Sequence, residues 1–193
     1  MPLSVMSIIL SGMVFAVLHS LLASDPVKNK CYSKGISPRA YRLAYTVIAV
    51  AATTVWLSYV RRLPDQHLYV TEGLSRWLLY MMQLSGLLIF WLSLKPVEIA
   101  AFLGLTGFTG DEAPFIEQGI YRIVRHPMYC SIIIIMYAMP DQTVNSLTLY
   151  TVITCYFIVG ARFEERRMSR IHPEYAGYRN RVPAFVPRLK IPA

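Results

Sequence analysis

The chain has 193 residues, of which 55% are apolar and 16% are charged. This composition is too apolar for an ordinary soluble domain, and the chain is too short for two such domains. The formal net charge of +8 does not indicate a nucleic-acid partner, because the basic residues cluster beside apolar segments and no nucleic-acid recognition motif occurs. We therefore expect one integral membrane protein in contact with membrane lipids.

Five apolar segments follow one another along the chain, at 3–23, 42–60, 77–94, 127–139 and 144–161. Because a spanning helix needs about 20 apolar residues, they predict an all-α fold, a polytopic membrane helix bundle of about five transmembrane helices. We expect a single integral membrane domain over 1–193, with a three-helix part over 1–94 and a hairpin with a tail over 95–193. The first segment is expected to stay as a helix, not to be cleaved as a signal peptide.

The distribution of basic residues predicts the orientation. Segment 24–42 carries five Lys or Arg against one Asp, and the tail after Ala161 carries eight Lys or Arg against three Glu. By the positive-inside rule both are cytoplasmic, which puts the N-terminus outside and the C-terminus in the cytoplasm. The loop at 61–76 gives a weaker, opposing signal. Between 95 and 118 the pattern fits either a short interfacial helix followed by a cytoplasmic loop or a plain linker.

The fourth apolar segment is shorter than a bilayer. Pro127 suits the first turn of a helix, and residues 140–143 are typical of a turn. That leaves 13 residues, or about 20 Å of helix against a core of ~30 Å. If the helix falls short at its cytoplasmic end, Arg125 and His126 lie below the headgroups. Irregular backbone there requires surrounding protein or a water-filled cavity, which predicts a pocket.

An acidic pair, Glu164 and Glu165, continues the last apolar segment. In an antiparallel hairpin these residues lie about 13 Å beyond the level of Pro127. A nucleoside-sized ligand could bridge that interval if Glu165 faces His126. Only one of two adjacent residues can face the partner helix squarely, so we expect unequal roles, with Glu165 the stronger candidate. The alternative is that both are solvated and pair along their own helix.

Other candidates carry similar alternatives. Arg125 could pair with an acid, anchor a lipid headgroup or bind a ligand carboxylate, and Tyr121 and Tyr129 could be interfacial aromatics. His126 precedes a proline, which holds it out of helical conformation and favours a site. His19 is a polar position inside the first span, where either a substrate contact or a helix-to-helix hydrogen bond explains it.

In the tail, Tyr175 and Tyr178 stand three residues apart and can share one helix face, either toward a pocket or as part of a docked amphipathic segment. The cysteines and histidines show no metal-ligand spacing, so we expect neither a metal site nor a disulfide framework.

Together these motifs resemble a known family. Gly-Ile-Tyr-Arg-x-x-Arg-His-Pro-x-Tyr at 119–129, Glu-Glu at 164–165 and Tyr-x-x-Tyr-x-x-Arg-Val-Pro at 175–183 are similar to the integral-membrane methyltransferases typified by isoprenylcysteine carboxyl methyltransferase and the phospholipid methyltransferases. His-Ser-Leu-Leu-Ala-Ser at 19–24 and Tyr-Arg-Leu-Ala-Tyr at 41–45 look like the NnrU-type and methanethiol S-methyltransferase branch.

The resemblance implies that the C-terminal catalytic hairpin and tail bind S-adenosyl-L-methionine, while a small-molecule or lipid-like acceptor enters from the membrane. The expected catalytic residues are Arg125, Glu165 and His19. The expected cofactor-binding residues are Tyr121, His126, Pro127, Met128, Tyr129, Glu164, Tyr175, Tyr178 and Arg181.

The function expected on this basis is S-methylation of a small or lipophilic thiol, whose thiolate is the nucleophile. The alternatives are methylation of an isoprenylcysteine carboxylate or a phospholipid amine, a sterol-type membrane reductase using a nicotinamide cofactor, and a non-enzymatic NnrU-type accessory protein. The branch resembled suggests a bacterial inner membrane.

Overall fold

The computed structural model describes residues 2–107 and 115–188. The chain divides into two compact units. Unit 1 comprises Met1–Leu68, Glu98–Ala113 and Thr143–Ile153, and unit 2 comprises Tyr69–Val97, Pro114–Gln142 and Thr154–Ala193.

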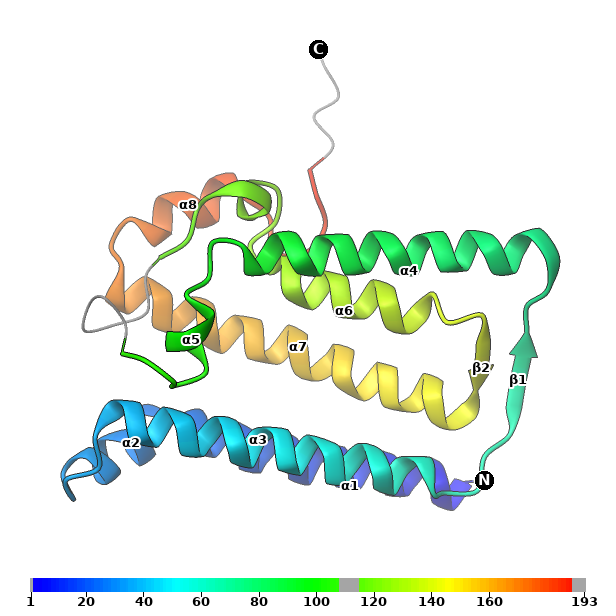
Figure 1. Ribbon diagram of the computed structural model, residues 1–193, viewed down its shortest axis with the longest axis horizontal. Coiled ribbons are helices and arrows are strands. Elements are labelled where there is room, and N and C mark those ends of the chain that lie inside the picture. Colours follow the sequence, from blue (N-terminus) through cyan, green and yellow to red (C-terminus); the bar gives the residue numbers. More distant parts are fainter. Residues whose placement is uncertain (1, 108–114, 189–193) are drawn as a thin grey trace, which may run out of the picture. The chain divides into compact units, whose positions relative to one another are not determined.

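The described residues are mostly helical (Figure 1). The helices are α1 (Pro2–Ala23), α2 (Asp25–Tyr32), α3 (Pro38–Arg61), α4 (Gly73–Leu94), α5 (Ile99–Phe102), the short 3₁₀ helix η1 (Gly119–Arg122), α6 (Pro127–Tyr137), α7 (Val144–Ile171) and α8 (Tyr175–Arg181). Helices α1, α3, α4 and α7 are long and apolar enough to cross a membrane, and α6 is a shorter apolar helix. The prediction of a polytopic membrane helix bundle is confirmed.

Local sequence signals explain where two of these helices begin. Ser37 precedes α3, and its hydroxyl accepts a hydrogen bond from the backbone N–H of Ala40 at 3.2 Å, which is the usual role of an N-cap serine. Pro38 and Pro127 are the first residues of α3 and α6, where the missing proline N–H leaves no helical bond unmade.

In unit 1, α1 and α3 pack through a small apolar core around Ile8, Trp56 and Val60. The indole N–H of Trp56 donates to the Ser11 hydroxyl at 3.0 Å. Gly12 permits this close packing, because a Cβ at this position would lie 2.6 Å from Val152 Cγ1.

In unit 2, α4 packs along α6 at close range. A Cβ added at Gly86 would lie 2.7 Å from Ile135 Cγ1 and 3.2 Å from the carbonyl oxygen of Ser131. The Gln83 amide nitrogen also donates to the Ile135 carbonyl at 3.2 Å. A glycine is therefore required where these two helices cross.

The connection between α6 and α7 differs from the expected turn. Residues Asp141–Thr143 are extended as β2, which pairs with β1 (His67–Val70). Within unit 2, both carboxylate oxygens of Asp141 accept hydrogen bonds from the Arg76 guanidinium, at 3.2 and 2.8 Å. These partners hold the segment extended, so the prediction of a turn there is wrong.

The region between α4 and η1 matches the first of its two predicted forms in part. A four-residue helix, α5, lies inside the apolar stretch expected to form a short interfacial helix. Part of the cytoplasmic loop expected after it, at 108–114, lies outside the described residues.

Candidate functional site

The site is built around the corner Arg125-His126-Pro127 of unit 2. His126 has φ −121° and ψ 58°, outside the helical region, and the fully buried Pro127 then begins α6. The prediction that the proline holds His126 out of helical conformation is confirmed.

The C-terminal tail runs beside this corner. The backbone N–H of Arg125 donates to the Pro183 carbonyl at 2.9 Å, and that of His126 donates to the Ala184 carbonyl at 3.1 Å. The irregular backbone before α6 thus obtains the partners that buried peptide groups require.

Glu165 is the centre of a buried cluster of charges. Its Oε1 atom accepts from Arg125 Nε at 2.8 Å, from Arg125 Nη2 at 2.6 Å and from His126 Nε2 at 3.0 Å. The side chains of Arg125 and Glu165 are each only 9% exposed. Charge-assisted bonds of this kind are among the strongest in proteins, so the cluster fixes the C-terminal part of α7 against the corner.

The sequence-based expectation of an interval between the corner and the glutamates is only half right. Glu165 does face His126, as predicted. However, the chain before α6 brings Arg125 and His126 directly to Glu165, because α7 with its 28 residues extends far beyond the 11-residue α6. The two helices measure about 42 and 17 Å. The side chains are in direct hydrogen-bonding contact.

The remaining donors of Arg125 are also directed at the protein. Its Nη1 atom donates to the carbonyl of Arg179 at 3.1 Å and to that of Val182. A guanidinium engaged at all three nitrogens acts as a clamp between α7 and the tail. This leaves little of Arg125 to bind a ligand carboxylate, which was one of its three predicted roles.

Glu164 has a different environment from its neighbour. Its side chain is 52% exposed, its Oε2 atom accepts from the Tyr129 hydroxyl at 3.1 Å, and His126 Nδ1 lies 3.8 Å away. The two glutamates therefore differ in burial and contacts, while their unequal roles stay a prediction. Glu165 is the buried member, and Glu164 is the member whose carboxylate is open to a ligand.

Aromatic rings stack beside the charged cluster. The His126 ring lies between Phe185 and Tyr129, with both centroids 5.4 Å away, and Tyr129 stacks in turn on Phe157 at 4.6 Å. The two inner rings, His126 and Tyr129, cover each other, so only the half-buried end rings Phe185 and Phe157 can offer a face to a ligand. Such faces suit a planar ring or a cationic group.

Tyr175 and Tyr178 form the core of the tail and pack with Phe115 and Met168. The Tyr178 hydroxyl donates to the Tyr121 carbonyl at 2.6 Å. Burial raises the pKa of Tyr175 to about 12, with the nearby Glu165 charge adding to it, and raises that of Tyr178 as well. Both phenols stay neutral and anchor α8; direct contact with a cofactor stays a prediction for them.

Two further predicted residues lie at the edge of the site. The Tyr121 hydroxyl donates to the Ser93 carbonyl at 3.3 Å, and burial, followed by the Glu164 charge, raises the pKa of Tyr121 to about 12. Arg181 is 63% exposed and its Nη2 atom lies 2.7 Å from Glu117 Oε1. The half-buried Met128 follows Pro127 in the first turn of α6.

A polar hollow of about 520 Å³ opens beside the cluster, lined by Arg125, Ser169, Ala176, Arg179, Asn180 and Arg188. Arg179 Nε lies 3.6 Å from Glu165 Oε2. Two exposed arginines at a polar hollow suit an anionic group such as a carboxylate. A group of His, Cys, Asp and Glu side chains that could hold a metal ion is not found among residues 2–107 and 115–188.

His19 lies in unit 1, on α1. The Tyr45 hydroxyl of α3 is 3.0 Å from its Nε2 atom and 3.2 Å from its Nδ1 atom. This is the helix-to-helix hydrogen bond that the sequence left open as one explanation of His19. A part in acceptor chemistry stays a prediction.

Sequence reasoning missed several residues of the site. Phe157 and Phe185 complete the aromatic stack, and Arg179 and Arg188 line the hollow. The phenylalanines looked like ordinary apolar residues, and the arginines were not separable from the other basic residues of the tail. The tail's closeness to the corner, through Pro183 and Ala184, makes Arg179, Phe185 and Arg188 neighbours of the site, whereas Phe157 reaches it from α7 by stacking on Tyr129.

The apolar helices and the charged corner before α6 define a polytopic membrane protein with a site at one end of a helix hairpin. The sequence matches the NnrU protein family over residues 7–187, and the chain belongs to that family.

The chain is also similar to individual proteins. It is 29% identical to methanethiol S-methyltransferase 2 of Bradyrhizobium diazoefficiens, over 91% of this chain and 70% of that protein. It is 26% identical to methanethiol S-methyltransferase of Pseudomonas deceptionensis, over 98% and 75% of the two chains. The enzyme of the same name from Mycobacterium tuberculosis is 26% identical, over 95% and 78%. No solved structure matches this chain.

Proposed function

We propose that this protein is a membrane S-methyltransferase that uses S-adenosyl-L-methionine to methylate a small thiol, with methanethiol as the first acceptor to test. Relatives named methanethiol S-methyltransferase align over nine tenths of the chain. The observation that carries the proposal is the unequal pair of glutamates beside the aromatic stack, where Glu164 offers a half-exposed carboxylate to a cationic ligand.

The reaction is an in-line displacement. The thiolate sulfur attacks the methyl carbon, a carbon–sulfur bond forms, and the bond between the methyl carbon and the sulfonium sulfur breaks with its electrons. The thiol proton goes to water. S-Adenosyl-L-methionine supplies the activated methyl group. Charge is consumed as the reaction proceeds, so the protein assists mainly by positioning the reactants and excluding water.

Three features fit the methyl donor. Glu164 would balance the sulfonium charge or accept hydrogen bonds from the ribose hydroxyls, and the Tyr129 hydroxyl at 3.1 Å holds its carboxylate in place. The adenine would pack against a half-buried end ring of the aromatic row, Phe185 or Phe157. Arg179 and Arg188 would bind the donor's carboxylate in the hollow of about 520 Å³.

Arg125 and Glu165 act as positioning residues in this proposal. Their mutual bonds at 2.6 and 2.8 Å occupy both groups, so they act through the placement of α7 and the tail. Tyr175 and Tyr178 belong to the same support, since they are 4% and 2% exposed. His19 is kept as a candidate contact for the acceptor on α1.

The proposal includes a location. The basic residues of 24–42 and of the tail favour the cytoplasm for both, and five membrane crossings then put the N-terminus outside. The three named relatives are bacterial proteins, which supports a bacterial inner membrane. We also propose that the two compact units act as a single integral membrane domain.

The test uses the full chain purified in detergent. Binding of S-adenosyl-L-methionine is measured by calorimetry, and methyl transfer is measured with labelled donor and a panel of methanethiol, longer thiols, prenylcysteines and lipid amines. We expect donor binding and formation of dimethyl sulfide from methanethiol. Binding of NADPH instead, or of neither cofactor, would refute the proposal, and methylation of only prenylcysteine or amines would refute the thiol acceptor.

A pair of glutamate variants locates the site. Glu164→Gln removes the carboxylate that is open to the ligand, and we expect donor affinity to fall about tenfold, as loss of a charge-assisted contact implies. Glu174→Gln is the matched control, because Glu174 is 58% exposed and pairs with His172 on the tail. Equal affinities of the two variants would remove Glu164 from the donor site.

A further inference from the structure

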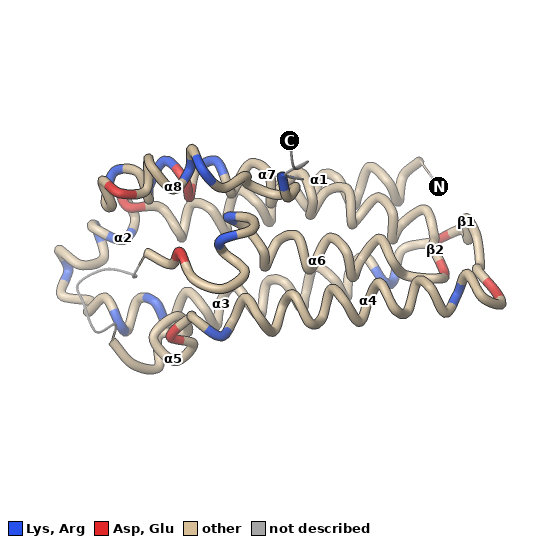
Figure 2. Tube along the Cα trace, turned by 90° about the horizontal axis from the view of Figure 1, so that it is seen from above, with Lys and Arg blue, Asp and Glu red and all other residues tan. Residues whose placement is uncertain are grey.

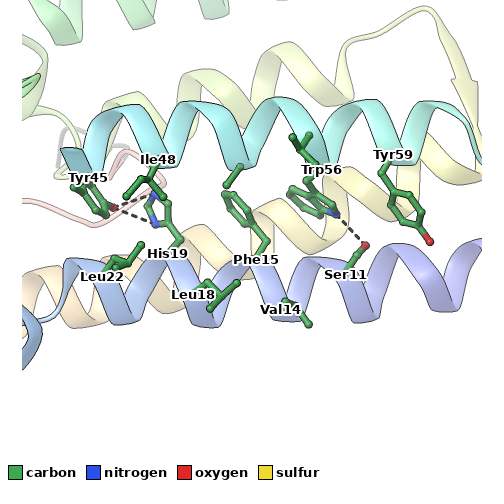
Figure 3. A pocket seen from close by; sticks show the side chains of 13 residues that line it. Ser11, Val14, Phe15, Leu18, His19, Leu22, Tyr45, Ile48, Trp56 and Tyr59 are labelled. Carbon is green, nitrogen blue, oxygen red and sulfur yellow. Dashed lines mark hydrogen bonds between the residues drawn. The ribbon is translucent and has the colours of Figure 1, made fainter. Parts of the chain in front are cut away.

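A second cavity lies in unit 1, between the membrane helices α1 and α3. It has a volume of about 430 Å³ and forms a groove along the two helices (Figure 3). Its lining is Ser11, Val14, Phe15, Leu18, His19, Leu22, Tyr45, Ile48, Ala49, Ala52, Val55, Trp56 and Tyr59. From Ser11 to Leu22 the groove follows α1 for about 16 Å, which suits an elongated ligand.

The polar groups within the groove contact each other. His19 and Tyr45 form a hydrogen-bonded pair at 3.0 Å, and Trp56 donates to Ser11 at 3.0 Å (Figure 3). Phe15 stacks between them, 5.4 Å from the His19 ring and 4.9 Å from the Trp56 ring. Because these polar groups bond to one another, the groove presents a largely apolar surface that suits a hydrocarbon chain.

The rim of the groove is open. Val14, Leu18 and Val55 are 59, 55 and 69% exposed. Since α1 and α3 are long and apolar enough to span a membrane, groups exposed on them meet lipid chains. A lipid chain can thus enter the groove sideways.

One end of the groove carries positive charge. The groove ends at Leu22 and Tyr45, and the Tyr41 hydroxyl ties this end together by donating to the Leu22 carbonyl at 2.6 Å. The segment that follows, α2 and the start of α3, is basic (Figure 2). It carries Lys28, Lys30, Lys34, Arg39 and Arg42 against the single acid Asp25.

We propose that this groove is a binding site for an anionic phospholipid. One acyl chain lies along Phe15 and Trp56, and the phosphate headgroup lies among the basic residues beyond Leu22. The charge at one end and the apolar lining along the rest match the two parts of such a lipid. The site requires no methyl transfer, so it stands or falls separately from the proposed function.

The test places the full chain in vesicles of unbrominated phosphatidylcholine with a minor fraction of brominated phosphatidylglycerol or brominated phosphatidylcholine. Bromine on an acyl chain quenches a nearby indole. Trp77→Phe and Trp91→Phe remove the other two tryptophans, both on α4, so that Trp56 alone reports. We expect brominated phosphatidylglycerol to be favoured on the order of fivefold, the preference that one basic contact gives.

Two pairs of variants locate the lipid. Ala52→Leu fills the groove and should reduce quenching by both lipids, whereas Ala51→Leu, on the same helix but outside the lining, should not. Arg39→Gln, in the first turn of α3, should reduce the preference for phosphatidylglycerol, whereas Arg61→Gln, in its last turn, should not.

Equal quenching by the two lipids in the otherwise unaltered chain would overturn the proposal, and this comparison does not depend on how any groove variant folds. Unchanged quenching in folded Ala52→Leu would show that the chain lies elsewhere and would overturn it equally. Loss of the headgroup preference in Arg61→Gln but not in Arg39→Gln would place the headgroup at the wrong end of the groove.

Discussion

Replacing Glu165 by glutamine leaves the Arg125 guanidinium without its anionic partner at a position that is only 9% exposed to water. Glu165 Oε1 accepts three hydrogen bonds, at 2.6, 2.8 and 3.0 Å, and all come from Arg125 or His126. Both members of the ion pair are 9% exposed, so solvent screening reduces the effect little. Removal of one partner from a buried pair costs about 3–5 kcal/mol. We expect Glu165→Gln to lower the free energy of unfolding by that amount.

The assay is a double-mutant cycle. Arg125→Gln, Glu165→Gln and the double variant are unfolded in detergent with increasing sodium dodecyl sulfate, and helix content is followed by circular dichroism. The double variant has no unpaired buried charge, since Arg179, which also loses a carboxylate neighbour, is exposed. Its loss should therefore be smaller than the sum of the two single losses by about 2–3 kcal/mol.

An exposed ion pair of the same unit is the control. Arg76 and Asp141 are 33 and 41% exposed and lie 2.8 Å apart. Arg76→Gln should lower the free energy of unfolding far less than Glu165→Gln, because solvent screens an exposed pair. If Glu165→Gln is no more destabilising than this control, or if the two single losses in the cycle simply add, the clamp described for Arg125 is refuted.

Three other changes test the packing and the pH dependence. Gly86→Val should lower the free energy of unfolding by about 1–3 kcal/mol, because its side chain overlaps Ile135. Tyr178→Phe should lower it by about 1 kcal/mol, through loss of the 2.6 Å bond to the Tyr121 carbonyl. Burial raises the pKa of Asp65, but hydrogen bonds and the His67 charge outweigh it and leave the pKa lowered. The stabilisation from Asp65 should be full above its ordinary pKa of 3.8 and vanish as the pH falls through its folded value. Unfolding in detergent measures the loss in the Gly86→Val and Tyr178→Phe variants. The same unfolding repeated across a range of pH measures the contribution of Asp65.

The glycine and the Asp65 predictions each have a control that could contradict them. Gly160→Ala, also in a membrane helix but with open space around it, should be tolerated, so equal losses in Gly160→Ala and Gly86→Val would point to a general glycine effect. An Asp65→Asn variant should lack the acid-dependent component, and an unchanged pH profile would remove Asp65 as its source.

The fold was predictable because the bilayer imposes simple rules. Runs of about 20 apolar residues and their flanking charges are visible in the chain, and they located α1, α3, α4 and α7 without knowledge of packing. The connection at 140–143 was not predictable in the same way. Its extended form depends on Arg76 and on a strand far away in sequence.

The charged cluster was partly predictable. The short helix after Pro127 and the acids at the end of the last apolar segment indicated that His126 and Glu165 face each other. The sequence could not show that the Arg125 guanidinium donates hydrogen bonds to the backbone carbonyls of Arg179 and Val182. Every residue has a backbone carbonyl, so the sequence does not reveal which carbonyls a side chain contacts. Arg125 therefore looked available to bind a ligand.

The bonds from Arg125 and His126 to the carbonyls of Pro183 and Ala184 have a consequence for biosynthesis. Residues 183–185 are synthesised after all the membrane helices, because those helices precede them in the chain. Until then the corner before α6 lacks its backbone partners, and Phe185 cannot cover His126. A chain cut after residue 180 would therefore contain every described helix that could span the membrane, yet the corner before α6 would lack these backbone partners and Phe185 could not cover His126.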